Sequence, residues 1–254
     1  MKATATAINS RYPSRISDRH DADGRPEGSC EGASSLDAMA SQTPDPDAPW
    51  TVPAPSDVAE LLGAAPARWW LSGGVALDHW LGRTIRVRPH TDVSTTSADL
   101  PQLLGSLPGR YSAWASLEDE LVRWDAAPDD ADLQPLRIHD DEQGEWMLQL
   151  DVEDGTQEAW LYRRDPRLQL PWDRAVLDIG GIPTGAPEVQ LVWKALRPRP
   201  QDDVDKDAVL PELSADARSW YERAILSIHP HSSWSIHVRS PFAPAKASWN
   251  KRGR

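Results

Sequence analysis

The spacing of apolar and polar residues divides the chain into a strand-rich front half and a helical back half. Short apolar or β-branched runs bounded by Gly, Pro and Asp predict strands at residues 68–72, 92–96, 111–115, 134–139, 145–152 and 159–163. Apolar residues three or four positions apart predict helices, one capped by Ser56 and Asp57 and others at 75–81, 98–106, 189–196, 202–210 and 214–226. The fold class that we expect is α/β (α+β), a small mixed sheet with flanking helices and a helical C-terminal part.

The ends of the chain differ in composition from its middle. Residues 1–48 are rich in Ser, Ala, Asp, Arg and Pro and show no apolar periodicity. Such a segment cannot bury enough apolar surface to offset its ordering entropy, so we predict that it is disordered. Residues 235–254 hold Lys and Arg but no acid, and we predict a basic flexible tail. Between the ends, 49–185 is the predicted α/β domain and 186–234 the predicted C-terminal helical part.

Charge and cysteine content limit the classes of function. The formal net charge of −12 disfavours binding to nucleic acid or to an anionic membrane, and the basic tail is the feature that speaks for a nucleic-acid-modifying transferase. The single cysteine, Cys30, excludes an internal disulfide and fits a reducing compartment. We find neither a signal-peptide pattern nor an apolar run near the ~18 residues that span a bilayer. We therefore expect a cytoplasmic protein that acts on a small molecule.

The candidate chemistry begins at a double glycine. Gly73 and Gly74 stand between a predicted strand and a predicted helix, where glycine lets backbone N–H groups approach phosphate oxygens. Ser72 either adds a hydroxyl to the phosphates or caps the helix. Asp92 follows on the next strand and is a candidate metal ligand. Each feature alone is typical of a plain turn or strand edge, but their combination favours a phosphate and metal site.

The metal site lacks one expected carboxylate. Two Asp residues at i and i+2 of a strand project from one face and can share a pair of metal ions. Ser94 stands where the second Asp would be needed, and a neutral hydroxyl binds Mg²⁺ weakly. Gln149 and Asp151 compete for a third position on a later strand. Asp151 is either a ligand or the polar end of a strand before a turn at 153–155.

These residues carry a family resemblance. The segment 69–100 resembles the opening motif of the aminoglycoside adenylyltransferase-like nucleotidyltransferases, in which a tryptophan-rich strand leads into Gly-Gly-x-Ala-Leu-Asp and then Arg-x-His-x-Asp-x-Asp. Ser94 departs from that motif at its last position. Further segments that resemble an actinobacterial branch of the family lie at 160–166, 186–195, 199–205, 210–211 and 230–234.

The resemblance implies a nucleotidyltransferase fold that uses ATP and Mg²⁺ and transfers an adenylyl group to a hydroxyl of a small polar, aminoglycoside-like molecule. Ser72, Gly73 and Gly74 would contact the phosphates, and Asp92 with Asp151 would serve metal binding and catalysis. Lys194 would offset triphosphate charge, or it is an ordinary helix-surface lysine.

Two acids on a predicted helix are candidates for the substrate. Asp202 and Asp205 lie at i and i+3 on one helix face. They would receive a substrate amine, or they form a solvated helix start.

Two functions therefore compete. The first is an active nucleotidyltransferase that modifies a small hydroxylated molecule. The second, favoured by Ser94, is a catalytically inactive pseudoenzyme that uses the same fold as a binding or regulatory module.

Overall fold

The computed structural model describes residues 43–126 and 135–239, and it is a mixed α/β fold. Expectations for residues 1–42 and 240–254 fall outside the described residues. A sheet of ten strands runs in the order β4-β3-β5-β6-β2-β1-β10-β9, and β7 and β8 extend it from β6. The strands are β1 (Trp69–Leu71), β2 (Thr91–Thr96), β3 (Tyr111–Leu117), β4 (Glu120–Arg123), β5 (Leu136–Asp140), β6 (Glu145–Gly155), β7 (Ala159–Leu161), β8 (Gln169–Pro171), β9 (Val176–Ile179) and β10 (Ile182–Gly185).

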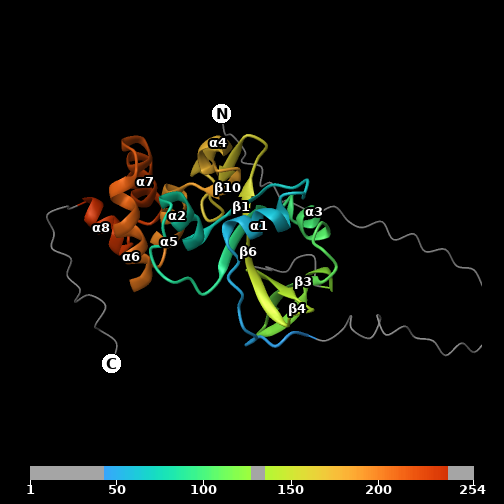
Figure 1. Ribbon diagram of the computed structural model, residues 1–254. Helices are drawn as coiled ribbons and strands as arrows, with labels where there is room; N and C mark the ends of the chain where they lie inside the picture. The colour runs from blue at the N-terminus through green and yellow to red at the C-terminus, as the bar shows by residue number, and fades with distance from the viewer. Residues whose placement is uncertain (1–42, 127–134, 240–254) are drawn as a thin grey trace, which may run out of the picture.

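The helices lie on both faces of the sheet, and those from the end of the chain gather at one side of the molecule (Figure 1). They are α1 (Pro55–Leu62), α2 (Gly73–Leu81), α3 (Leu100–Gly105), α4 (Trp172–Ala175), α5 (Pro187–Ala195), α6 (Pro200–Val209), α7 (Ala215–Ile228) and α8 (Ser233–Arg239). Among the described residues, no helix has the length and apolar character needed to cross a membrane.

Strand alternation gives the centre of the sheet two different faces. Val93 of β2 and Leu150 of β6 belong to a buried cluster that also contains Val58 of α1 and Leu103 of α3. Successive strand residues point to opposite faces, so Asp92 and its neighbours on the other face turn toward the C-terminal helices. A second cluster, centred on α5 and α7, packs on that side and includes Trp70 of β1.

Most predicted elements are present, with shifted ends. Helix α2 ends at Gly82 as expected, because this residue adopts φ 65°, a left-handed conformation that glycine reaches without strain. Helix α1 begins at Pro55, before the predicted cap, and the Asp57 carboxylate accepts the N–H of Ala54. The prediction omitted strands β4, β8, β9 and β10. Their short sequences carry no clear alternation, and β10 is extended because it pairs in parallel with β1.

Two predicted boundaries need correction. Residues 43–48 are not part of a disordered segment, because the Asp45 carbonyl accepts the indole N–H of buried Trp146 at 3.1 Å. The expected flexible tail from 235 also begins too early, since α8 extends to Arg239. Its Ser235 is fully buried and donates to the carbonyl oxygen of His229.

Trp146 is the residue through which we test this anchoring. Its ring is fully buried and lies 4.9 Å from the ring of His139. We predict that Trp146→Ala lowers the free energy of unfolding by about 3–5 kcal/mol, because a large cavity replaces the indole. Trp146→Phe should cost less, since it removes mainly the hydrogen bond to Asp45. Urea denaturation measures both, with Val87→Ala as the control because Val87 is 89% exposed. Equal stability of Trp146→Ala and the control would contradict the prediction.

Candidate functional site

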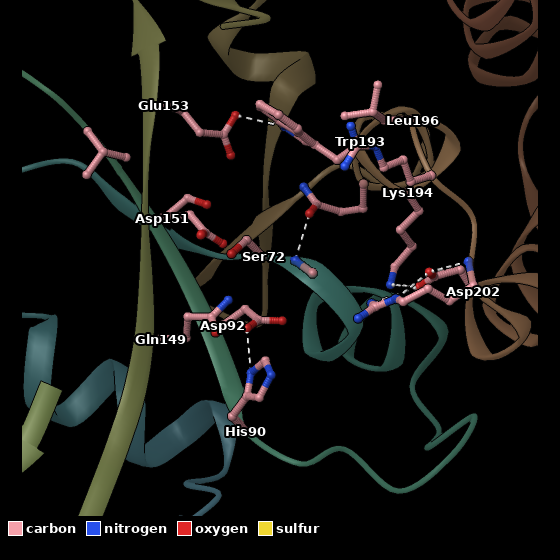
Figure 2. Close-up of a pocket in the computed structure, with 16 residues that line it drawn as sticks. Ser72, His90, Asp92, Gln149, Asp151, Glu153, Trp193, Lys194, Leu196 and Asp202 are labelled. Carbon is pink, nitrogen blue, oxygen red and sulfur yellow. Dashed lines mark hydrogen bonds and ion pairs between the residues drawn. The ribbon is translucent and has the colours of Figure 1, made fainter. Parts of the chain in front are cut away.

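A pocket of about 430 Å³ opens where β2 and β6 meet the start of α2 and the end of α5. Figure 2 shows acidic side chains of the two strands on one side and Lys194 with Asp202 on the other. The lining residues are Ser72, Gly73, His90, Asp92, Ser94, Gln149, Asp151, Val152, Glu153, Gln190, Trp193, Lys194, Leu196, Arg197, Arg199 and Asp202.

The first turn of α2 forms one wall of the pocket. Gly73 has φ 58°, and a Cβ atom there would lie 2.1 Å from Oδ2 of Asp92, so only glycine fits. Its N–H donates to Oε1 of Gln190 at 2.7 Å. The hydroxyl of Ser72 is buried, lines the pocket and has no hydrogen-bond partner among the described residues. A buried hydroxyl of this kind is available to a ligand.

Gly74 has a role in packing that was not expected. It does not line the pocket. A Cβ atom at this position would lie 2.4 Å from Nη1 of Arg88. The second glycine therefore makes room for a buried guanidinium, and its expected contact with phosphate stays a prediction.

Parallel pairing of β2 with β6 assembles the acidic floor. Asp92 lies opposite Gln149, and Ser94 lies opposite Asp151. Of the two competing positions on β6, Asp151 is thus the one beside the missing carboxylate, while Gln149 flanks Asp92. Both strands present these side chains to the pocket. Asp92 and Asp151 are 59 positions apart in the sequence, and the pairing brings them into one site.

The environments of the floor residues set their protonation. His90 Nδ1 lies 2.7 Å from Oδ1 of Asp92, and the hydrogen bond to that carboxylate raises the pKa of His90. Removal from water, with the negative charges of Asp92 and Glu153 nearby, raises the pKa of Asp151 to about 7. Asp151 therefore exchanges its proton near neutral pH.

Glu153 is a site residue that sequence reasoning placed in a turn. Strand β6 continues to Gly155, so Glu153 remains on the pocket face and is 3% exposed. Its carboxylate accepts the indole N–H groups of Trp160 and Trp193, the latter at 3.2 Å. Burial raises the pKa of this carboxyl even though these donors favour the charged form.

Lys194 lines the pocket from α5 and is held by two acids of α6. Its ammonium lies 2.8 Å from Oδ1 of Asp202 and 3.0 Å from Oδ2 of Asp205. Burial alone would raise the pKa of Asp202, but hydrogen bonds from Arg199 and Lys194 hold that pKa well below its usual range. Lys194 is therefore a positioned cation at the edge of the pocket and not a free helix-surface lysine.

Asp205 is the centre of a buried cluster of charges. It is fully buried and contacts Arg86, Arg88 and Lys194. Arg88 also forms a two-bond contact with Asp78, at 2.7 Å for each bond. Asp205 does not line the pocket. Asp205 therefore contacts internal cations and lies away from the pocket, while the expected contact of Asp202 with a substrate stays a prediction.

The carboxylates of the pocket reach only the smallest number of protein ligands with which Mg²⁺ is commonly bound. Among the described residues, no group of three or more His, Cys, Asp or Glu side chains is placed to hold a metal ion. Mg²⁺ is, however, commonly bound by one or two carboxylates, with water and substrate phosphates completing the shell. Asp92 and Asp151 satisfy that requirement, and Ser94 supplies no charge.

Comparisons with known proteins add similarity of fold at low identity. No family model and no curated protein matches the chain. The solution structure of the antibiotic-resistance factor ANT(2'')-Ia is similar, with 15% identity, a TM-score of 0.46, and coverage of 73% of this chain and 96% of that chain. A crystal structure of ANT(2")-Ia in complex with adenylyl-2"-tobramycin has 15% identity and a TM-score of 0.45, covering 69% and 98%.

A third similar structure is an antigenic nucleotidyltransferase-like protein from Paracoccidioides brasiliensis, with 17% identity and a TM-score of 0.39, covering 72% of this chain and 89% of that chain. At these identities and TM-scores the comparisons carry no functional argument.

Several pocket residues were not predicted as site residues. Gln190 and Trp193 lie in a helix whose apolar spacing indicates only a packed face, and Arg199 precedes a helix as an ordinary polar residue. Their positions depend on how α5 and α6 pack beside β2. The alternation within 149–153 was the one signal that pointed to Glu153, since it shares a strand face with Asp151.

The raised pKa of Asp151 generates a prediction about pH. Its folded-state value of about 7 lies above the ordinary 3.8, so the contribution of Asp151 to the stability of the wild-type protein falls as pH rises from about 4 to about 7. We predict that Asp151→Asn removes this loss, and that its stability relative to wild type increases between pH 4 and pH 8. Urea unfolding in metal-free buffer measures the difference. Asp125→Asn is the control, because that side chain is 51% exposed. A difference between Asp151→Asn and wild type that stays constant with pH would refute the prediction.

Proposed function

We propose that the chain is a nucleotidyltransferase that moves an adenylyl group from ATP to a hydroxyl of a small polar molecule. The observation that supports this most strongly is that the Ser72–Gly73 turn lies in the same pocket as Asp92 and Asp151, which stand on two adjacent parallel strands. The start of α2 turns the positive end of its helix dipole toward the pocket, where it favours phosphates. Carboxylates beside such a turn suit a metal-bound triphosphate.

The cations beside the pocket support binding of the triphosphate. The ion pairs around Asp205 and Asp202 join the three acids Asp78, Asp202 and Asp205 to four cations, of which Arg199 is 63% exposed. The cations are Arg86, Arg88, Lys194 and Arg199. Lys194 and Arg199 reach the pocket, where their positive charge favours an anion. Ser72 would add its unpartnered hydroxyl.

The strand side would hold Mg²⁺ through Asp92 and Asp151. When bound, such an ion neutralises phosphate charge and orients the attacking oxygen. His90 fixes the orientation of the Asp92 carboxylate through its contact with Oδ1. Asp151 would take the proton of the acceptor hydroxyl on the carboxylate oxygen that the ion does not use.

Gly73 provides the test of this function. We predict that Gly73→Ala weakens Mg²⁺-dependent ATP binding about tenfold or more, because the new methyl group would displace the Asp92 carboxylate. The matched control is Gly82→Ala, which also has positive φ (65°) but no atom within 4 Å of the added Cβ. Isothermal titration calorimetry gives affinity, and urea unfolding gives the stability of each variant. Equal weakening of ATP binding by both substitutions would contradict the proposal.

A second candidate function is a pseudoenzyme that binds nucleotide without turnover. Ser94, which faces Asp151 across the strand pair, is the observation that favours it. The acidic floor then has one carboxylate fewer than a paired motif would give. Such a protein would act as a binding or regulatory module on the same scaffold.

Ser94→Asp separates the two functions. We predict that it strengthens Mg²⁺-dependent ATP binding by about tenfold or more, since a second carboxylate would join the floor. In the absence of metal it should lower stability, because the new charge at a position 1% exposed lies opposite Asp151.

Ser94→Ala is the matched control and should bring no gain in affinity. ATP turnover by wild type supports the transferase, and turnover only in Ser94→Asp supports the pseudoenzyme. If Ser94→Asp and Ser94→Ala bind ATP alike in magnesium, the floor does not hold metal.

A further inference from the structure

The charges around the pocket are divided between two walls. The strand wall consists of Asp92, Asp151 and Glu153. The helical wall consists of Lys194, Arg197 and Arg199, on the segment from α5 to the start of α6. A molecule that carries several amines would bind most strongly through carboxylates of this pocket. The availability of those carboxylates therefore determines which acceptor can enter.

Three of the pocket carboxylates already have partners inside the protein, which weakens their attraction for an amine. Asp202 contacts Lys194 at 2.8 Å and Arg199 at 2.9 Å, and Asp92 contacts His90 at 2.7 Å. Glu153 is buried against two indole N–H groups. Asp151 is left, and it is the group that the proposed function uses for metal and proton transfer. A polyamine would thus meet uncompensated positive charge on the helical wall, which is unfavourable.

Arg197 is the cation that remains available on that wall. It lines the pocket and is exposed, and none of the described residues forms a hydrogen bond or ion pair with it. Arg199 and Lys194, in contrast, are tied to Asp202 in the buried cluster. The planar guanidinium group binds carboxylate and phosphate groups through two parallel hydrogen bonds. A free guanidinium at a pocket rim is suited to an anionic ligand.

We propose that the acceptor is a hydroxyl compound that bears an anionic group, a carboxylate or a phosphate, and that Arg197 receives this group. The inference rests on the proposed function. In the reaction, the acceptor hydroxyl oxygen forms a bond to the α-phosphorus of ATP. The bond between that phosphorus and the oxygen that bridges the α- and β-phosphates breaks. Pyrophosphate leaves, and the hydroxyl proton passes to Asp151. The substrate class therefore differs from an aminoglycoside-like polyamine.

The test compares probes that share a ring and differ in charge. The full chain, with ATP and Mg²⁺, is given glucuronate, glucose, glucosamine or tobramycin at equal concentration, and pyrophosphate release above the acceptor-free rate is measured. We expect release with glucuronate to exceed release with glucosamine by about tenfold, as for one charge-assisted contact. Arg197→Gln should remove the preference, and Arg197→Lys should keep part of it.

Arg123→Gln is the matched control, because this arginine lies on β4, its side chain is 41% exposed, and it forms an ion pair with Asp125, away from the pocket. It should leave the preference unchanged. Faster release with glucosamine or tobramycin, or equal release with all probes, overturns the inference.

Calorimetry of Mg²⁺ and ATP on each variant separates the remaining cases. If Arg197→Gln weakens ATP binding itself, Arg197 serves the triphosphate and the inference fails. If wild type binds no ATP, the proposed function fails and the inference with it.

Discussion

The parallel pairing of β2 with β6 is the constraint on which the rest of the site depends. Because side chains alternate along both strands, this one register sends Val93 and Leu150 into the core beneath α1 and α3. It sends Asp92, Ser94 and Asp151 into the pocket. A slip of one residue would exchange the two sets and bury the carboxylates in an apolar layer. The hydrophobic core therefore fixes the geometry of the polar floor.

The buried cluster around Asp205 provides the opposite wall. Through Arg88 it joins the end of α2 to α6, and through Lys194 it joins α6 to α5. Charges removed from water require partners with good geometry, and loss of one partner leaves the others uncompensated. The cluster thus has two consequences, because it holds the C-terminal helices beside the sheet and places the ammonium of Lys194 at the edge of the pocket. Gly74 is part of the same arrangement, since it gives the Arg88 guanidinium its space.

The sequence predicted what depends on local pattern. The fold class, the turn at Gly73 and the end of α2 at Gly82 all follow from periodicity or from glycine at particular positions, whereas Asp151 was one of two positions left open beside Asp92 until the strand pairing placed it. The partners of each charge did not follow. Asp205 was expected to face a substrate, but its contacts with Arg86 and Arg88 bring together residues more than one hundred positions apart. Tertiary packing decides such contacts, and a single sequence carries no local signal for them.

The central claim is that the strand carboxylates and the α2 turn form a nucleotide and metal site despite Ser94. Calorimetric titration of ATP into the protein, with and without Mg²⁺, in wild type and Asp92→Asn, tests it most directly. The account predicts binding that requires Mg²⁺ in wild type and is lost in Asp92→Asn while the fold remains intact. Binding that is the same in both proteins, or no binding in wild type, would contradict it.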